Sequence, residues 1–294
     1  MQPSLWSNFF HLLKPAQTVR EIKAAGFDFS ELACETVVDP TNRFSAKLAQ
    51  ELRAACDEVG LRTPQVHYPI CTLNPAVRYK GWDPDMLTEF AHPKEDRREF
   101  DIRCAEELLE LCPVCGIEVM VVHPGGLKGW SSDEERRKIR DLNIEAFQRM
   151  ARTAEKHNVI IAAENMGSIE GRASFGADFE ELSQMVDAVG SAHVGICVDT
   201  SHANYMRVDI PAAIRFAGTR IVATHISDNL GQHDDHLMPY AGSITWPPIV
   251  EALKSIGYQR LFNLEIPGEN RCPLEILRLK ASYARKLLTE MLGV

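Results

Sequence analysis

Apolar residues occur along the chain in short runs, and a longer segment with helical spacing follows most of them. Several runs, such as VIIAAE and VGICVD, are apolar almost throughout rather than alternating with polar residues. This pattern is typical of parallel strands that helices cover on one face and that pack inside a barrel on the other. It predicts eight strands, at residues 3–8, 29–33, 64–68, 118–123, 159–164, 194–199, 220–225 and 260–265.

The segments between these strands have the spacing of amphipathic helices. Ser45 is suited to cap a helix whose apolar stripe lies within 48–59, and a second stripe lies within 139–154, with one polar interruption at Asn143. Glycines at 60, 116 and 257 stand where such helices would end. Eight strand–helix units without a long linker predict an α/β fold, a single (β/α)8 TIM barrel, as one domain over residues 1–294.

The longest irregular segments are expected after the third strand, at about 69–100, and after the fifth, at about 165–177. In a barrel of this kind both segments lie on the face that carries the chemistry, so they are candidate lids. The first contains Tyr79 and Trp82, which could cover a substrate or pack within their own loop.

Composition narrows the classes of partner. A net charge of -9, with acidic and basic residues mixed along the helices, offers no basic face for a nucleic acid backbone. No eighteen apolar residues occur together and the N-terminal segment lacks a secretion-signal pattern, so no membrane association is expected. Eight scattered cysteines favour reduced thiols, and CPVC at 112–115 has no second pair to complete a zinc site. We therefore expect a cytoplasmic protein.

Acidic residues and histidines recur at the carboxyl ends of the predicted strands, where barrel enzymes place their chemistry. From the third strand to the eighth, these residues are His67, His123, Glu164, Asp199, His225 and Glu265. For His67 and His123, the roles of metal ligand, substrate contact and hydrogen-bonded core histidine all stay open. His202, three residues after Asp199, is close enough to join such a site or to bind substrate.

The buried charge at these strand ends points to a metal. Carboxylates directly follow the runs IIAA, ICV and LFNL, so they stand at the ends of hydrophobic strands. An unpaired buried charge costs on the order of several kcal/mol unless something compensates it. A divalent cation compensates several carboxylates together. A set of three carboxylates and one imidazole without a thiolate suits Mn²⁺, Zn²⁺, Co²⁺ or Mg²⁺. The alternative is a structural ion-pair network, although no Lys or Arg ends a predicted strand.

The motifs along nearly the whole chain resemble the xylose isomerase-like TIM barrels, a family of sugar phosphate isomerases and epimerases, inosose dehydratases and nucleases of the endonuclease IV type. They are GFDFSELACE, VVHPGG, AAENMG, VGICVDTSHAN, ATHISDN and NLEIPGE. The segment DDHLMPYAGSITW, residues 234–246, resembles the family's loop after the seventh strand.

The resemblance implies a metal-dependent sugar or sugar phosphate isomerase or epimerase with a small carbohydrate as its substrate. One divalent ion, foremost Mn²⁺ or Zn²⁺, would be held by Glu164, Asp199, His225 and Glu265. Glu164 and Glu265 would act as an acid/base pair, with proton transfer through a cis-enediolate. Substrate contacts are expected from His67, His123, His202, Asp228, His236 and Trp246, and a homo-oligomer stays open.

Two alternative activities follow from the same resemblance. The first is a lyase or dehydratase that acts on a keto-sugar, an inosose or a keto-glycoside. The second is an apurinic-site endonuclease with three zinc ions, because this chain has suitable residues at His67, His123, Glu164, Asp199, His202, His225, Asp234, His236 and Glu265. The acidic charge and the lack of evident basic loops argue against the nuclease.

Two further comparisons concern ketose 3-epimerases. These enzymes usually carry an Arg shortly after the strand-seven His, and residues 226–236 contain none. Glu170 resembles an epimerase substrate contact only by its spacing from Glu164, and a solvated loop position suits it equally. Within HISDNLGQHDDH, His233 and Asp235 are expected to face solvent, whereas Asp234 and His236 could contact substrate or bind additional metals.

Overall fold

Eight parallel strands close into a barrel in the computed structural model, which describes residues 1–73, 86–169, 171–269 and 271–294. Each strand pairs with its neighbours along the chain, and the last pairs with the first. The strands are β1 (Gln2–Trp6), β2 (Phe29–Ala33), β3 (Arg62–His67), β4 (Val119–Val122), β5 (Ile160–Glu164), β8 (Val194–Asp199), β9 (Ile221–Ile226) and β10 (Leu261–Leu264). The predicted (β/α)8 TIM barrel is confirmed, and the strand ends differ from the prediction by at most two residues.

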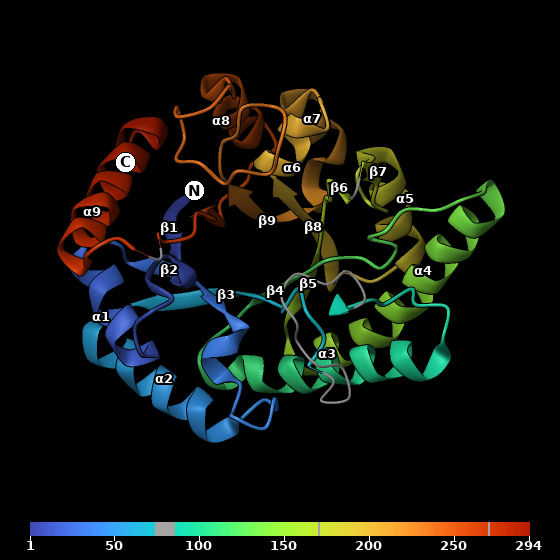
Figure 1. The fold of residues 1–294 in the computed structure, drawn as a ribbon, viewed down its shortest axis with the longest axis horizontal. Coiled ribbons are helices and arrows are strands. Elements are labelled where there is room, and N and C mark those ends of the chain that lie inside the picture. Colours follow the sequence, from blue (N-terminus) through green and yellow to red (C-terminus); the bar gives the residue numbers. More distant parts are fainter. Residues whose placement is uncertain (74–85, 170, 270) are drawn as a thin grey trace.

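Helices form a ring around these strands (Figure 1). They are α1 (Pro15–Ala24), α2 (Ala46–Val59), α3 (Glu95–Cys115), α4 (Asp133–His157), α5 (Phe179–Val189), α6 (Thr200–Tyr205), α7 (Ile210–Ala217), α8 (Trp246–Ser255) and α9 (Leu274–Leu292). The first and last helices meet where Arg278 of α9 donates two hydrogen bonds to Glu21 of α1, at 2.7 and 2.6 Å. Among the described residues, no helix is both long and apolar enough to cross a membrane.

The helix ends follow the predicted capping chemistry. The Ser45 hydroxyl accepts a hydrogen bond from the Leu48 amide at 3.4 Å, and Gly60 and Gly116 end α2 and α3 in the left-handed conformation. The polar interruption at Asn143 also has a cause, because its side chain is buried and exchanges hydrogen bonds of 2.7 and 3.0 Å with the backbone of Gly125. Asn143 thus ties α4 to the loop that follows β4.

The two long segments differ from expectation in their detail. Helix α3 begins at Glu95, so the irregular segment after β3 is shorter than predicted. The segment after β5 contains a small hairpin, β6 (Ser168–Ile169) with β7 (Arg172–Ala173). Tyr79, Trp82 and Glu170 lie outside the described residues, so their predicted roles stay predictions.

Below its mouth, the barrel interior is apolar on the side of β4, β5, β8 and β9. A cluster of small and branched side chains lies there, separate from the larger core between strands and helices: Val119, Val121, Ala162, Cys197 and Ala223. Successive side chains of a strand point to opposite faces, so residues two positions further along point into the same interior. The inward-facing residues that follow this apolar cluster along the strands therefore line the carboxyl-terminal mouth of the barrel.

Candidate metal centre

The strand-end residues predicted from the sequence occupy this inward face. Glu164 lies two residues after Ala162, Asp199 two after Cys197 and His225 two after Ala223. Glu265 follows directly after β10. All four side chains are buried, with Glu265 the most exposed at 4%. The alternation that fills the barrel with apolar side chains thus places the acidic residues directly above them.

These four residues converge on one point. Each offers a ligand atom, and these atoms all lie within 4.8 Å of one another. The Nδ1 atom of His225 lies 3.0 Å from Oε1 of Glu164 and 3.1 Å from Oε2 of Glu265. In the described part of the chain, every ion pair of these carboxylates is with a histidine and none is with Lys or Arg. The alternative of a structural network with barrel lysines or arginines therefore finds no support.

Three carboxylate oxygens of the cluster lack a hydrogen-bond donor although they are fully enclosed. They are Oε2 of Glu164, Oδ2 of Asp199 and Oε2 of Glu265, and none of the three accepts a hydrogen bond from a described residue. Imidazole nitrogens approach two of them, at 3.2 and 3.1 Å, without hydrogen-bond geometry. Buried carboxylate oxygens are costly unless compensated, so three orphaned oxygens around one imidazole nitrogen fit a divalent cation.

The electrostatics of the cluster indicate the same need for positive charge. Burial, together with the charges of Glu265 and Glu164, raises the pKa of Asp199 to about 7, although His202 opposes this shift. Burial lowers the pKa of His225, but Cys197 and the surrounding glutamates outweigh it, so that pKa is raised well above its usual value. Without a cation, protons on imidazoles carry the compensating charge, and a bound metal would replace them.

His67 and His123 form a flanking pair on one side of the centre. Their Nε2 atoms are 3.2 Å apart, and each approaches Oε2 of Glu164, at 3.5 and 3.2 Å. The Nδ1 atom of His67 lies 3.2 Å from Oε1 of Glu265. His67, His123 and Glu164 could therefore hold a second ion.

His202 and His236 form the flanking pair on the other side, with Asp234 between them. The Nε2 atoms of the two rings lie 3.2 and 3.1 Å from the same Oδ2 of Asp234. Their Nδ1 atoms lie 2.9 and 2.8 Å from the backbone carbonyls of Asn165 and Glu265. The backbone of His236 is left-handed, with φ of 47°, which is uncommon outside glycine and is often held in place at functional sites. His233 and Asp235 are exposed, as predicted.

Asp228 and Trp246 were expected to contact substrate, but the structure places both in the wall behind the site. Each is fully buried. Oδ2 of Asp228 accepts from the Trp246 indole at 3.1 Å and the Tyr240 amide at 3.0 Å, and Oδ1 accepts from the Asn229 and Ile244 amides. Both side chains therefore support the loop at 228–245, and their predicted contact with substrate stays a prediction.

Two site residues escaped the sequence analysis. Glu31 of β2 is fully buried and its Oε2 lies 2.9 Å from Nε2 of His225. Trp6 ends β1 with its ring 6.1 Å from that of His67, and its buried indole N–H has no partner among the described residues. The alternation of side chains along the strand FSELA places Glu31 on the inward face, and this was a signal in the sequence. Trp6 is neither acidic nor a histidine and did not stand out.

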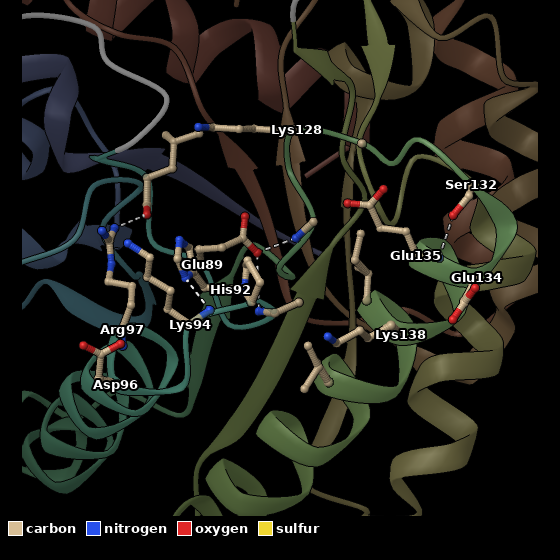
Figure 2. Close-up of a pocket in the computed structure, with 17 residues that line it drawn as sticks. Glu89, His92, Lys94, Asp96, Arg97, Lys128, Ser132, Glu134, Glu135 and Lys138 are labelled. Atoms are coloured by element: carbon tan, nitrogen blue, oxygen red, sulfur yellow. Dashed lines mark hydrogen bonds between the residues drawn. The ribbon is translucent and has the colours of Figure 1, made fainter.

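A large cavity lies beside this centre rather than in it. It has a volume of about 900 Å³ and opens between the segment before α3 and the start of α4. Figure 2 shows Lys94 and Arg97 on one side and Lys138 and Glu135 on the other, with Glu89 between them. Glu89 lines this cavity and accepts a hydrogen bond from the Gly126 amide. Gly126 belongs to the loop after β4 that begins at His123, so this loop lies between the cavity and the centre.

The fold and the site together define the class of this protein, which is a closed parallel barrel with a candidate metal site at its mouth. The sequence model of the xylose isomerase-like TIM barrel matches residues 19–288. The chain belongs to this family.

Relatives within the family have different activities. A D-psicose 3-epimerase of Enterocloster bolteae is 26% identical over 244 residues, which are 81% of this chain and 72% of that protein. A probable endonuclease 4 of Aquifex aeolicus is 25% identical over 214 residues, 67% of this chain and 74% of the relative. The crystal structure of a D-tagatose 3-epimerase-like protein superposes with a TM-score of 0.78 at 23% identity, covering 100% of this chain and 98% of that one. The last comparison supports the fold alone.

Proposed function

We propose that this protein is a divalent-metal-dependent isomerase or epimerase of a sugar or sugar phosphate. The observation that carries the proposal is the pair of buried glutamates, Glu164 and Glu265, which flank Nδ1 of His225 and each hold one oxygen without a donor. A 3-epimerase of a ketose among the relatives supports the substrate class.

The residues that would hold the metal are Glu164, Asp199, His225 and Glu265. Their donor set of carboxylate oxygens and one imidazole nitrogen suits Mn²⁺ or Zn²⁺, with Co²⁺ or Mg²⁺ as alternatives. When bound, such an ion polarises a sugar carbonyl and makes the proton on the neighbouring carbon more acidic.

Proton transfer would fall to the two glutamates. One carboxylate would remove the proton beside the sugar carbonyl, and the other would return a proton to the same or the adjacent carbon of the enediolate. A sugar hydroxyl would bind between the Nε2 atoms of His202 and His236 in place of the Asp234 oxygen that both face, and on the other side His67 and His123 would hold hydroxyls with their Nε2 atoms.

Exchange of solvent deuterium into a panel of ketoses, aldoses, inososes and keto-glycosides tests the proposal. Glu164→Gln and Glu265→Gln are each expected to lower the exchange rate by roughly 10²- to 10⁴-fold, the usual contribution of a positioned acid or base. Glu251→Gln on the exposed face of α8 is the matched control. Metal content of each variant separates a lost base from a lost ion. Exchange that persists in both site variants would refute the acid/base assignment, and loss of water from the sugar would indicate a dehydratase.

Hydrolysis of phosphodiesters at a three-metal centre is the second candidate function. The specific observation is that His67, His123 and Glu164 lie on one side of the central set, and His202, Asp234 and His236 on the other. The relative from Aquifex aeolicus is a probable endonuclease 4. The net charge of -9 is unfavourable for binding to a nucleic acid backbone.

Metal analysis after dialysis against excess Zn²⁺ or Mn²⁺ separates the two functions. About one ion per chain with deuterium exchange into sugars is expected for the isomerase or epimerase. About three ions with cleavage of a duplex that contains an abasic site would favour the nuclease and overturn the first proposal.

A further inference from the structure

A layer of polar side chains crosses the barrel directly beneath the candidate metal centre. Glu31 of β2 accepts hydrogen bonds from Nε2 of Gln65 and Nε2 of His225 through its Oε2, and from Nδ2 of Asn263 through its Oε1. The distances to His225 and Asn263 are 2.9 and 3.1 Å. Both carboxylate oxygens of Glu31 thus accept donors from the barrel wall, although Glu31 also lies close enough to His67 and His225 for the three to hold an ion.

The pairing of the strands holds this layer in register. Ser4 of β1 pairs with Asn263 of β10, Asn263 with His225 of β9, and Glu31 with Gln65 of β3. The Ser4 hydroxyl donates to Oδ1 of Asn263 at 2.8 Å, so the amide nitrogen of Asn263 must face Glu31. The Asn263 amide can therefore only donate to Glu31, and a carboxylate, which only accepts, suits this position better than an amide.

The contact between Glu31 and His225 also decides which ring nitrogen carries the hydrogen. Without a metal, Nδ1 of His225 is hydrogen-bonded to Oε1 of Glu164 at 3.0 Å and lies 3.1 Å from Oε2 of Glu265. When a metal replaces the proton on Nδ1, the neutral imidazole keeps one N–H, which Nε2 carries and donates to Glu31. Ligand histidines are commonly oriented in this way by a carboxylate on the other nitrogen.

We propose that Glu31 is a positioning residue, which fixes the ring orientation and tautomer of His225 so that Nδ1 faces the cluster as a metal ligand. This inference rests on the proposed metal-dependent function and adds a residue outside the four candidate ligands. Glu31 also places a fourth buried carboxylate beside the centre, and this charge favours a divalent cation over an empty site.

Glu31→Gln tests the inference because it keeps the size of the side chain. The new amide group would face the donors of Gln65, His225 or Asn263, so the ring of His225 loses its fixed acceptor. We expect the Kd for Mn²⁺, measured by calorimetry on metal-free protein, to rise about 10- to 100-fold, the usual cost of losing such a partner. The visible spectrum of the Co²⁺-loaded variant should change as well, because the nitrogen ligand is no longer held in place.

Two controls separate positioning from structural support. Glu21→Gln removes another buried carboxylate, whose partner is Arg278 far from the centre, and should lower the Tm without changing the Kd for Mn²⁺. If Glu31 acts through His225, adding Glu31→Gln to His225→Ala should not raise the Kd further. An unchanged Kd and Co²⁺ spectrum in Glu31→Gln would overturn the inference while wild type still binds metal. Failure of the wild type to bind Mn²⁺, Zn²⁺ or Co²⁺ would overturn the proposed function itself.

Discussion

Exchange of Asp199 for Asn should have opposite effects on the stability of the metal-free and metal-bound protein. Oδ1 of Asp199 accepts from the His202 amide at 2.6 Å, and an Asn side chain can keep that hydrogen bond. Oδ2 is buried without a donor among the described residues and lies in the cluster with Glu164 and Glu265. The substitution therefore removes a buried charge that only a cation would compensate.

The sign and size of the effect follow from the pKa of Asp199, which burial and the nearby glutamates raise from 3.8 to about 7. Because the folded-state pKa lies above that of the unfolded chain, ionisation of Asp199 lowers stability as the pH rises from about 4, and the full loss is reached above about 7. At about 1.4 kcal/mol for each tenfold change in proton affinity, the upper bound is about 4 kcal/mol. Relaxation and the added amide reduce this, so we expect a gain of about 1–3 kcal/mol at pH 8.

A gain of this size is measurable as a shift in Tm. An unfolding entropy of about 0.6 kcal/mol/K for a chain of this length converts it into a rise of about 2–5 °C in the metal-free protein. Wild type in metal at about 100 times its Kd should gain about 2.7 kcal/mol, or about 4 °C, and the variant should lose this increase. Calorimetry of EDTA-treated protein at pH 8, with and without Mn²⁺, measures both effects.

Asp209→Asn provides the matched control, because Asp209 caps α7 outside the site and Asn caps helices equally well. Its Tm and its metal-dependent shift should match those of wild type. The reasoning is refuted if Asp199→Asn lowers the Tm by the same amount with and without metal, since Asp199 would then be a structural residue and not a ligand.

Three further predictions concern the surroundings of the site. Gly242→Ala would place a Cβ 2.3 Å from Oδ1 of Asp228 and from the Asn229 carbonyl, so the loop at 228–245 should shift and the exchange rate into sugar should fall; unchanged activity and Tm would contradict this. Asn143→Ala leaves the Gly125 amide and carbonyl unpaired, and calorimetry should show a loss of about 2–4 kcal/mol, whereas a loss below about 0.5 kcal/mol would show that the loop re-pairs elsewhere. Of the eight thiols, only Cys71 and Cys272 are partly exposed, and burial raises the pKa of Cys56 and Cys115 to about 11, so a chromogenic disulfide should titrate two thiols quickly in the native state and eight after unfolding.

The strands were predictable because parallel strands buried on both faces are apolar almost throughout, as in VIIAAE and VGICVD. The beginning of β3 was harder to place, since RTPQ is mostly polar. The structure explains this polarity: Thr63 bonds the Cys115 carbonyl, and Gln65 belongs to the polar layer around Glu31. A strand that contributes to a polar layer inside the barrel lacks the apolar signal on which the prediction depends.

The candidate ligands were predictable for a related reason, because a charged residue that directly ends an apolar strand is unusual enough to be noticed. Glu31 stands within a strand and has no such contrast. Its inward-facing position could have been noticed, but its role depends on which residues lie across the barrel, and only the structure shows these. Asp228 and Trp246 show the reverse case. Their position in a family-like motif suggested substrate contact, which stays a prediction, whereas the hydrogen bonds by which both support the loop were visible only in the structure.

The two flanking pairs are not equivalent as sites for further ions. Both imidazoles of His202 and His236 face one carboxylate oxygen of Asp234, so their Nε2 atoms already have an acceptor. The Nε2 atoms of His67 and His123 instead face each other at 3.2 Å and share Glu164 with the central set. Two ring nitrogens at that distance must share a proton or a cation, because two N–H groups would repel. Any second ion should therefore bind first between His67, His123 and Glu164, and the pair around Asp234 is better suited to sugar hydroxyls.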